Sequence, residues 1–345
     1  MLRRGHGDEA LAGAEVCFQR LGPTVIDSSV NARLATGTVL WVALLLSLAS
    51  CTRPQDVRTT ARARPPDPAP AAQNPSPMIE STRRHERIAN DSVRGIRFVV
   101  ANVLAQPVQV FVPARAGAAA TLLVHFHGTA YIPEQAVAAE SRDYLLAVIN
   151  LGAGSGVYER AFANAALLLA LRDSVQRGVQ LRLGRSVSLP RIVLSGFSAG
   201  SGAIRAILRT DSIASLVNGV LFLDGIHTSY VPEGRVQALG GTLDSTRLES
   251  IVRYARRAMR GETQMVVTHS EIFPGTFAST TETADYLLRE LALARTPVLA
   301  WGPVGMQRLS EAVRGGFRLE GFAGNSAPDH IDHYHGFAQF LKSLN

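Results

Sequence analysis

Residues 191–200 are RIVLSGFSAG, an apolar run that leads into the pattern glycine–x–serine–x–glycine at Gly196 to Gly200. We expect residues 191–194 to form a buried β-strand and residues 200–209 to form a helix. Ser198 then lies at the tip of a tight turn, where a Cβ on either flanking glycine would clash. The turn also points a helix N-terminus at the serine, and that end of a helix favours developing negative charge. The stretch therefore predicts Ser198 as a nucleophile.

The chain on both sides of this turn alternates short β-rich runs with longer helical stretches. We expect strands at residues 96–104, 108–112, 121–126, 145–150, 191–194, 219–223, 264–268 and 317–322. We expect helices at residues 158–181, 200–209, 245–260 and 279–294, with a last helix that ends near residue 344. The first two strands form an antiparallel pair, and the sequence STTE at 279–282 is a capping box that opens a helix. The alternation predicts an α/β fold, a mostly parallel central sheet with helices on both faces.

Two histidine-containing segments follow strands. Residues 125–129 are HFHGT at the end of a strand, and residues 329–335 are DHIDHYH ahead of the last helix. A serine nucleophile needs a base with a pKa near neutrality, which favours histidine. A metal site is the competing interpretation of both segments. No thiolate or remote carboxylate motif supports a metal cluster. We expect no metal and no cofactor.

The order of strand, serine, acid and histidine resembles the α/β-hydrolase superfamily over residues 93–345. The resemblance implies an α/β-hydrolase fold and acyl transfer chemistry. It also implies that the His-Gly pair at 127–128 begins the oxyanion loop. The oxyanion hole would then consist of the backbone N–H groups of Thr129 and Ala199, with Gly128 beside them. In this scheme His127 shapes the loop and takes no part in proton transfer.

The catalytic histidine is expected to be His330, with His333 as the alternative. His330 is nearest to the end of the preceding strand and directly follows the segment Ala327-Pro328-Asp329, and proline disfavours helix in the residue before it. His333 and His335 fall where the last helix is expected to have begun. A catalytic base must hang over the carboxyl edge of the sheet within about 2.6–3.2 Å of the serine hydroxyl.

The acid is expected to be Asp224, with Glu271 as the alternative. Asp224 ends the strand after the nucleophile helix and is followed by Gly225, and Glu271 ends the next strand. The resembled superfamily usually places its acid after the later strand, and some members place it one strand earlier. The glycine after the carboxylate, and His227 close by, favour Asp224.

The N-terminal part of the sequence predicts an export signal and a membrane anchor. An apolar run at residues 39–48 follows Arg33, and it is too short to span a bilayer, which needs roughly 20 residues. Residues 48–51, LASC, resemble the lipobox of bacterial lipoproteins, in which Cys51 would be lipidated. A plain signal peptide with an incidental cysteine is the alternative. Seven prolines then mark residues 52–88 as an extended tether.

These observations predict three segments. Residues 1–51 form an N-terminal extension with a lipoprotein signal peptide, residues 52–88 form the tether, and residues 89–345 form the hydrolase domain. Residues 226–262 are interpreted as a small cap insertion. The resulting location is the bacterial cell envelope, with the chain held to the membrane through its lipid anchor.

Charge and cysteine content argue against a nucleic-acid-binding protein and against thiol chemistry in the folded part. The net charge is +7, of which residues 1–90 carry +3, and Lys342 is the only lysine. The remaining basic residues are scattered, with no stripe interleaved with aromatic residues, so we expect no nucleic-acid partner. The two cysteines, Cys17 and Cys51, both precede the folded part, which therefore has no disulfide and no thiol nucleophile.

The expected activity is cleavage of a carboxylic ester through an acyl-enzyme, with a small-molecule or polymer-linked ester as substrate. A peptidase or amidase on the same fold would show the same three residues. A non-catalytic binding lipoprotein is the third interpretation, and the presence of all three signals together disfavours it. The sequence carries no signal for an oligomeric state.

Overall fold

The computed structural model describes residues 88 and 92–344. The predicted signal peptide, Cys51 and nearly all of the tether therefore lie outside the described residues. Within the described residues, no helix is long and apolar enough to cross a membrane.

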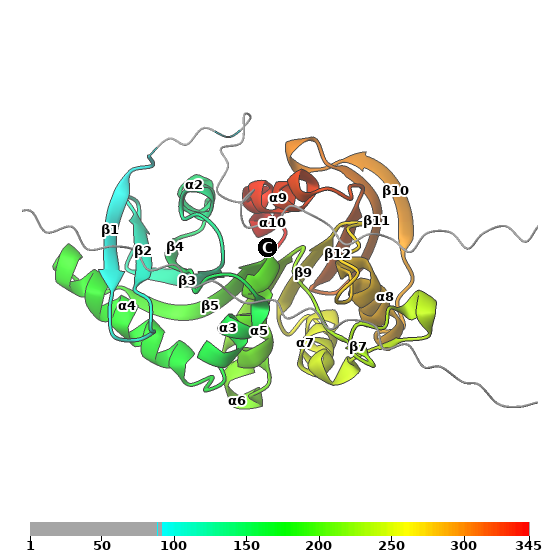
Figure 1. The fold of residues 1–345 in the computed structure, drawn as a ribbon. Coiled ribbons are helices and arrows are strands. Elements are labelled where there is room, and N and C mark those ends of the chain that lie inside the picture. The colour runs from blue at the N-terminus through cyan, green and yellow to red at the C-terminus, as the bar shows by residue number, and fades with distance from the viewer. Residues whose placement is uncertain (1–87, 89–91, 345) are drawn as a thin grey trace, which may run out of the picture. The chain divides into compact units, whose positions relative to one another are not determined.

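A ten-stranded sheet forms the centre of the described part of the chain (Figure 1). In spatial order its strands are β1 (Gly95–Val100), β2 (Val108–Pro113), β4 (Tyr144–Ile149), β3 (Ala119–Phe126), β5 (Ser188–Phe197), β6 (Val217–Leu223), β9 (Gln264–His269), β12 (Phe317–Phe322), β11 (Gln307–Arg314) and β10 (Thr296–Trp301). Pairing is parallel from β4 to β12 and antiparallel at both edges. The expected antiparallel pair is present as β1 and β2, in the register Val100 opposite Val108.

Helices cover both faces of this sheet, as the sequence predicts. The α-helices are α2 (Tyr131–Ala139), α3 (Ser155–Ala161), α4 (Leu167–Leu183), α5 (Ser201–Leu208), α6 (Asp211–Ala214), α7 (Glu249–Met259), α8 (Thr280–Glu290), α9 (Ala327–His335) and α10 (Phe337–Lys342). Helices α2, α9 and α10 gather on one side of the sheet in Figure 1, and α3, α4, α5 and α7 on the other. This layered, mostly parallel arrangement, with a serine turn directly after β5, is an α/β-hydrolase fold.

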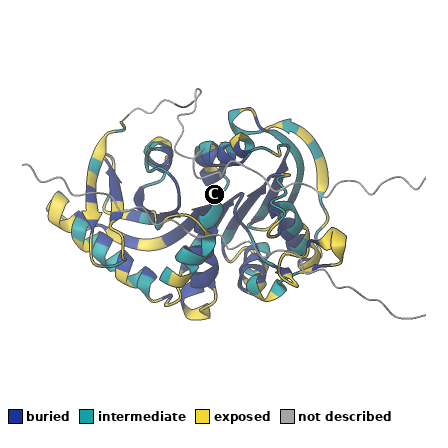
Figure 2. Ribbon diagram, in the orientation of Figure 1, coloured by how far each residue is buried: buried dark blue, intermediate teal, exposed yellow. Residues whose placement is uncertain are grey.

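Alternation of side chains along the central strands explains why the sheet has two cores. Along β3, Leu122 and Val124 belong to the core cluster under α3, α4 and α5, whereas Leu123 belongs to the cluster under α2, α9 and α10. All three side chains are fully buried. A strand with both faces covered has no position from which a side chain reaches water, which is why residues 121–126 are almost continuously apolar. Figure 2 shows this buried centre and the more exposed outer edge at β10.

The long helix expected at residues 158–181 is wrong, because the chain forms two helices there, α3 and α4. Phe162 ends α3 by turning into the core, where its ring meets that of Phe126 edge to face at 5.2 Å. The side chain of Asn164 then accepts a hydrogen bond from the N–H of Ala166 (3.2 Å), at the start of α4. The first of these helices is thereby free to pack against α5.

Other differences concern elements that the sequence did not predict. Helix α2, the edge strand β10 and its neighbour β11 were missed. Most residues of β11 are half-buried and its pattern mixes polar with apolar residues, and β10 contains Pro297, which is typical of an edge strand. The last helix is also two helices, α9 and α10, separated at Gly336.

The segment interpreted as a cap combines two kinds of structure. Residues Tyr230–Val231 and Thr242–Leu243 form a small antiparallel hairpin, β7 and β8, outside the main sheet. Helix α7, at the end of the same segment, instead packs into the core on one face of the main sheet. The part of the segment that leaves the sheet therefore ends before α7.

Candidate active site

Ser198 lies in the turn between β5 and α5, which is where the sequence places it. Its backbone has a φ of 48°, a left-handed value that a non-glycine residue rarely adopts. A single 3₁₀ turn, η1 (Ser198–Gly200), connects the strand to the helix. The side chain is half-buried and faces a cavity of about 720 Å³.

Close backbone approach explains the glycines of this turn. A Cβ on Gly196 would lie 2.9 Å from the amide nitrogen of Ser201, and one on Gly200 would overlap the carbonyl oxygen of Phe126. A third glycine, Gly225, is equally constrained, because a Cβ there would lie 2.8 Å from the carbonyl oxygen of Ser198. The glycine after Asp224 therefore lets the end of β6 approach the serine turn.

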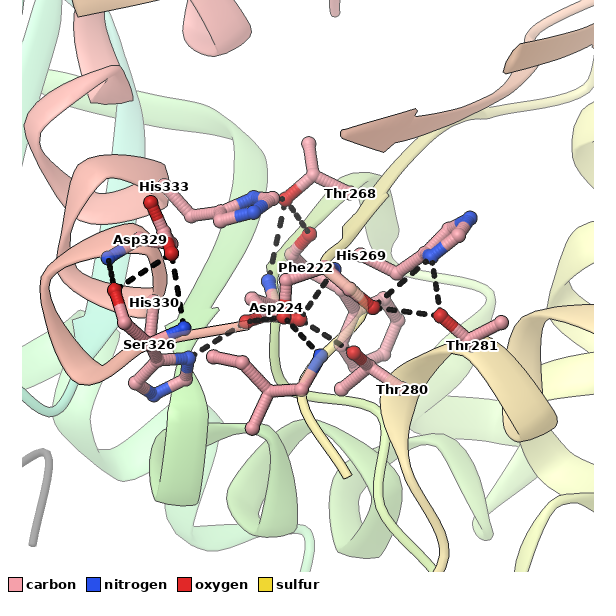
Figure 3. A network of polar contacts seen from close by, with 12 residues as sticks. Phe222, Asp224, Thr268, His269, Thr280, Thr281, Ser326, Asp329, His330 and His333 are labelled. Atoms are coloured by element: carbon pink, nitrogen blue, oxygen red, sulfur yellow. Dashed lines mark hydrogen bonds and ion pairs between the residues drawn. The ribbon is translucent and has the colours of Figure 1, made fainter. Parts of the chain in front are cut away.

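His330 and Asp224 are brought together beside the serine turn. The Nδ1 atom of His330 lies 2.6 Å from Oδ2 of Asp224, and both side chains are buried (Figure 3). The His330 ring also packs on the ring of Phe197, the residue before the serine, at 4.7 Å between centroids. Nε2 of His330 is buried and has no hydrogen-bond partner within the described residues. Ser198, Asp224 and His330 all line the same cavity.

The carboxylate of Asp224 is held by donors from two further elements. Ser270, directly after β9, donates from its N–H (2.9 Å) and its hydroxyl (2.7 Å), and the Thr280 hydroxyl donates at 2.5 Å. Burial by itself raises the pKa of Asp224, but His333, the hydrogen bond from His330 and that from Thr280 together hold this pKa well below its usual value. Asp224 therefore stays ionised, and its orientation is fixed.

The alternative site residues lie elsewhere. The Nδ1 atom of His333 bonds the hydroxyl of Thr268 at 2.8 Å, on the α9 face of the sheet. His335 contacts Asp332 at 3.3 Å. Glu271 is exposed, and its N–H donates to the carbonyl of Gly324 at 2.9 Å. None of these three lines the cavity in the described part of the chain.

His330 was preferred because it was expected to precede the last helix, and that expectation is wrong. Helix α9 begins at Ala327, so His330 belongs to its first turn and not to a preceding loop. Ser326 caps this helix in a capping box with Asp329, whose N–H it accepts and whose carboxylate accepts from Ser326. Pro328 occupies the first turn, where a missing N–H costs nothing. What separates the two histidines is therefore their contacts, Asp224 for His330 and Thr268 for His333.

Of the expected oxyanion residues, Ala199 lines the cavity directly after the nucleophile, whereas Thr129 and Gly128 are not part of its lining in the described chain. The N–H of Gly128 instead donates to the Asn150 side chain at 2.9 Å, so this group is already occupied. The carbonyl of Thr129 accepts from the hydroxyl of Tyr334 at 2.5 Å, which fixes the loop, and a Cβ on Gly128 would collide with the Tyr334 ring at 2.5 Å.

His125 and His127 are buried and serve different contacts. His125 bonds the hydroxyl of Ser195 at 2.9 Å, and burial lowers its pKa to about 3. His127 lines the cavity, and burial together with the neighbouring His330 lowers its pKa to about 4. The hydroxyl of Tyr158 accepts the N–H of Leu151 (3.1 Å) and is hydrogen-bonded to Nδ1 of His127 (2.8 Å). His127 is thus a neutral ring that is held in place.

Sequence reasoning missed the residues that support this site. Ser270 lies beside the alternative acid Glu271, and Thr280 belongs to a capping box whose sequence explains a helix start but not a contact with Asp224. No local pattern pointed to Tyr158 and Asn150, which are brought to the His-Gly loop by the fold. No group of three or more potential metal ligands is assembled within the described residues.

Comparison with known proteins adds distant structural similarity. No protein-family model matches this chain, and no curated protein sequence matches it. Similar solved structures include a thermostable esterase, with a TM-score of 0.41 and 16% identity over 72% of this chain and 60% of that protein. They also include an acylaminoacyl peptidase from Pyrococcus horikoshii, with a TM-score of 0.41 and 12% identity over 73% of this chain and 41% of that protein. A third is an acetyl xylan esterase from Aspergillus awamori, with a TM-score of 0.40 and 11% identity over 70% of this chain and 100% of that protein. The aligned region thus spans less than two thirds of the first two proteins.

Proposed function

We propose that this chain is a serine hydrolase that cleaves a carboxylic ester through an acyl-enzyme. The observation that carries the proposal is the His330–Asp224 pair, whose histidine has an unpartnered Nε2 among the described residues and lines the cavity that Ser198 faces. A serine on a strained strand-to-helix turn, a buried histidine and an ionised carboxylate are the parts that nucleophilic acyl transfer requires.

In the proposed mechanism, Oγ of Ser198 attacks the ester carbonyl while Nε2 of His330 takes the hydroxyl proton. Asp224 accepts from Nδ1 and stabilises the imidazolium that forms. The N–H groups of Ala199 and Thr129 are proposed to hold the oxyanion. His330 then returns the proton to the leaving alcohol oxygen. A water molecule, deprotonated by the same histidine, hydrolyses the acyl-enzyme and regenerates Ser198.

A fluorophosphonate probe tests this proposal, because it labels an activated serine. We expect stoichiometric labelling that peptide mass spectrometry maps to Ser198. A panel of short esters and matched amides then separates the reactions: turnover of esters supports an esterase, and preferential turnover of amides supports a peptidase or amidase. Failure of both labelling and turnover would favour a non-catalytic binding protein.

We also propose that the chain is exported and held at the bacterial cell envelope by lipid on Cys51. The proposal rests on the sequence at residues 48–51 and on the Pro-rich residues that follow. A lipid-anchored enzyme on a tether would reach substrates near the membrane surface.

A further inference from the structure

Three arginines share one carboxylate at the edge of the cavity. Oε2 of Glu159 accepts from Nη2 of Arg205 (2.5 Å) and from Nη2 of Arg247 (2.7 Å). Oε1 of the same residue accepts from Nη2 of Arg209 at 2.5 Å. One negative charge therefore faces three positive charges, and the cluster as a whole is cationic.

Two of the three arginines line the cavity. Arg205, on α5, is nearly fully buried, and Arg247, at the end of the 3₁₀ turn η3 (Ser245–Arg247), is 32% exposed. Arg209 is 47% exposed and is not part of the cavity lining in the described chain. The cationic cluster thus presents two guanidinium groups to the cavity of Ser198 and a third to solvent.

The protein leaves hydrogen-bond donors of these two guanidinium groups unused. Nη1 of Arg205 donates to the carbonyl of His227 (2.7 Å), and Nη1 of Arg247 reaches the hydroxyl of Ser229 at 3.4 Å. Nε of each arginine is buried and has no partner among the described residues. Each guanidinium offers five N–H groups, so donors outnumber the acceptors that the protein supplies.

Among the described residues, the one other ionised group on the cavity wall is Asp224, whose carboxylate is hydrogen-bonded to Ser270, Thr280 and His330. Its single negative charge does not cancel the net positive charge of the cluster, which holds three arginines and one glutamate. Burial lowers the pKa of His227 to about 4, so this ring is neutral near pH 7. Burial also lowers the pKa of Arg205, Glu159 opposes that effect, and the other two arginines of the cluster lower it further. A second anion beside Arg205 would relieve this repulsion.

We infer that Arg205 and Arg247 bind a negatively charged group of the substrate, a carboxylate in the simplest case, while its ester lies at Ser198. The inference rests on the proposed hydrolase function. Guanidinium groups bind carboxylates through paired, charge-assisted hydrogen bonds, and such bonds are stronger in a partly enclosed site than in open water. The substrate class is therefore an ester that carries an anion on its acyl or its alcohol part.

Two matched substrate pairs test the inference on the full-length protein. The first pair is 4-nitrophenyl hexanoate and the 4-nitrophenyl monoester of adipic acid, which places a carboxylate on the acyl chain. The second pair is 4-acetoxybenzamide and 4-acetoxybenzoate, which places it on the leaving group. We expect kcat/KM for the anionic member of at least one pair to exceed that of the neutral member by about tenfold or more.

Substitutions at the shared carboxylate separate recognition from structure. Arg247→Gln removes a cavity-lining partner of Glu159, and Arg209→Gln removes a partner of the same residue that lies outside the lining. We expect Arg247→Gln to reduce the anionic-to-neutral ratio of kcat/KM by about ten- to a hundredfold, and Arg209→Gln to leave it within about twofold. A guanidinium lost from a merely structural cluster would change both members of a pair equally.

The outcomes are distinguishable. If the wild-type protein hydrolyses neither pair and is not labelled by fluorophosphonate, the proposed hydrolase function fails. If it hydrolyses neutral esters without preferring an anionic one, or if Arg209→Gln and Arg247→Gln change the ratio equally, the function stands and the inference about Arg205 and Arg247 is overturned.

Discussion

The backbone at Ser198 is held in a left-handed conformation by its neighbours and not by its own side chain. Gly196, Gly200 and Gly225 allow the approaches that fix the turn. Conformations of this kind cost about 1–3 kcal/mol and persist where the surrounding structure determines them, as at many active sites. The hydroxyl is therefore free for chemistry, because folding does not depend on it.

Because the turn does not depend on the hydroxyl, Ser198→Ala tests the proposed chemistry of the serine separately from the fold. We expect the variant to fold with an unchanged circular dichroism spectrum and an unchanged urea midpoint. It should lose fluorophosphonate labelling and several orders of magnitude of ester turnover, because the group that forms the acyl-enzyme is gone. Near-native turnover in Ser198→Ala would show that another group performs the reaction.

The two candidate acids can be separated by a matched pair of substitutions. Asp224→Asn and Glu271→Gln each preserve side-chain size and remove a charge. Asp224 fixes the tautomer of His330, so we expect Asp224→Asn to lower kcat by about 10³–10⁴. Glu271 is exposed, so its substitution should change kcat less than about threefold. A larger loss from Glu271→Gln would contradict the assignment of Asp224.

At the scale of single residues, a candidate site residue could be predicted from the sequence where it lies in a recognisable local turn. The glycine pattern located Ser198, and the aspartate before Gly225 was preferred to the glutamate after β9. Ser270 and Thr280 could not be predicted, because their contacts with Asp224 join residues 46 and 56 positions apart. The use of the Gly128 amide by Asn150 could not be predicted either, since it depends on the approach of β4 to the loop after β3.

Helix α9 carries all three histidines that are candidates for the proposed base, His330, His333 and His335. His330 and His333 are three residues apart on this helix, and Figure 3 shows that they reach different partners, Asp224 for His330 and Thr268 for His333. His330 lies in the cavity lining, and His333 packs its ring against Phe340 and Phe322 in the core.

We therefore expect His330→Ala to abolish ester turnover, and His333→Ala and His335→Ala to retain at least a tenth of it. His333→Ala should also lower the free energy of unfolding by about 2–4 kcal/mol, because it leaves a cavity in the core and removes one hydrogen-bond partner of the Thr268 hydroxyl. The measurements are kcat at saturating ester and urea denaturation of each variant. Turnover that survives in His330→Ala but vanishes in a folded His333→Ala would reverse the assignment.

The Glu159 cluster joins α3, α5 and η3, and its stability should depend on pH. The pKa of Glu159 falls from 4.5 to about 2, because the hydrogen bonds and charges of its arginines outweigh the effect of burial. A depressed folded-state pKa gives stability that is fully present above the unfolded value of 4.5 and is lost as the pH falls towards 2.

Glu159→Gln leaves the buried Arg205 without a counter-ion, so we expect a loss of about 3–5 kcal/mol in the free energy of unfolding at pH 7. The difference in the free energy of unfolding between wild type and variant should narrow steadily from pH 4.5 to pH 2, as the wild-type carboxylate contributes less stability. Urea denaturation of both proteins at several pH values measures this difference. A gap that is independent of pH across this window would show that Glu159 does not act through its charge.

At the scale of elements, most of the central strands were predicted with bounds within two residues, although β5 is longer than the predicted 191–194, and β10 and β11 were missed. β3, β4 and β6 have a clear apolar signal because their side chains enter the cores on both faces of the sheet. β10 lies at the sheet edge with Leu299 and Trp301 exposed, so its sequence need not alternate towards a core. The split between α3 and α4 depends on the contact of Phe162 with β3, which periodicity does not encode.

At the scale of the whole molecule, the distribution of residue types divides the chain more clearly than any single motif. Both cysteines and seven closely spaced prolines precede residue 89, and the apolar strands follow it. The folded part therefore depends on its core for stability, and the preceding part carries the features that bear on location. The two cysteines allow the proposed anchor to be tested with an internal control.

We expect the full-length chain, produced in a bacterium that processes lipoproteins, to incorporate a labelled fatty acid at Cys51. Cys51→Ala should lose the label and appear in the soluble fraction, because the proposed anchor is its thiol-linked lipid. Cys17→Ala should keep the label and the membrane association, since Cys17 lies ahead of the apolar run and would be removed with the signal peptide. Ester turnover should be the same in both variants, because neither cysteine belongs to the described site. Equal labelling of Cys51→Ala and wild type would contradict the anchor and leave the hydrolase assignment unaffected.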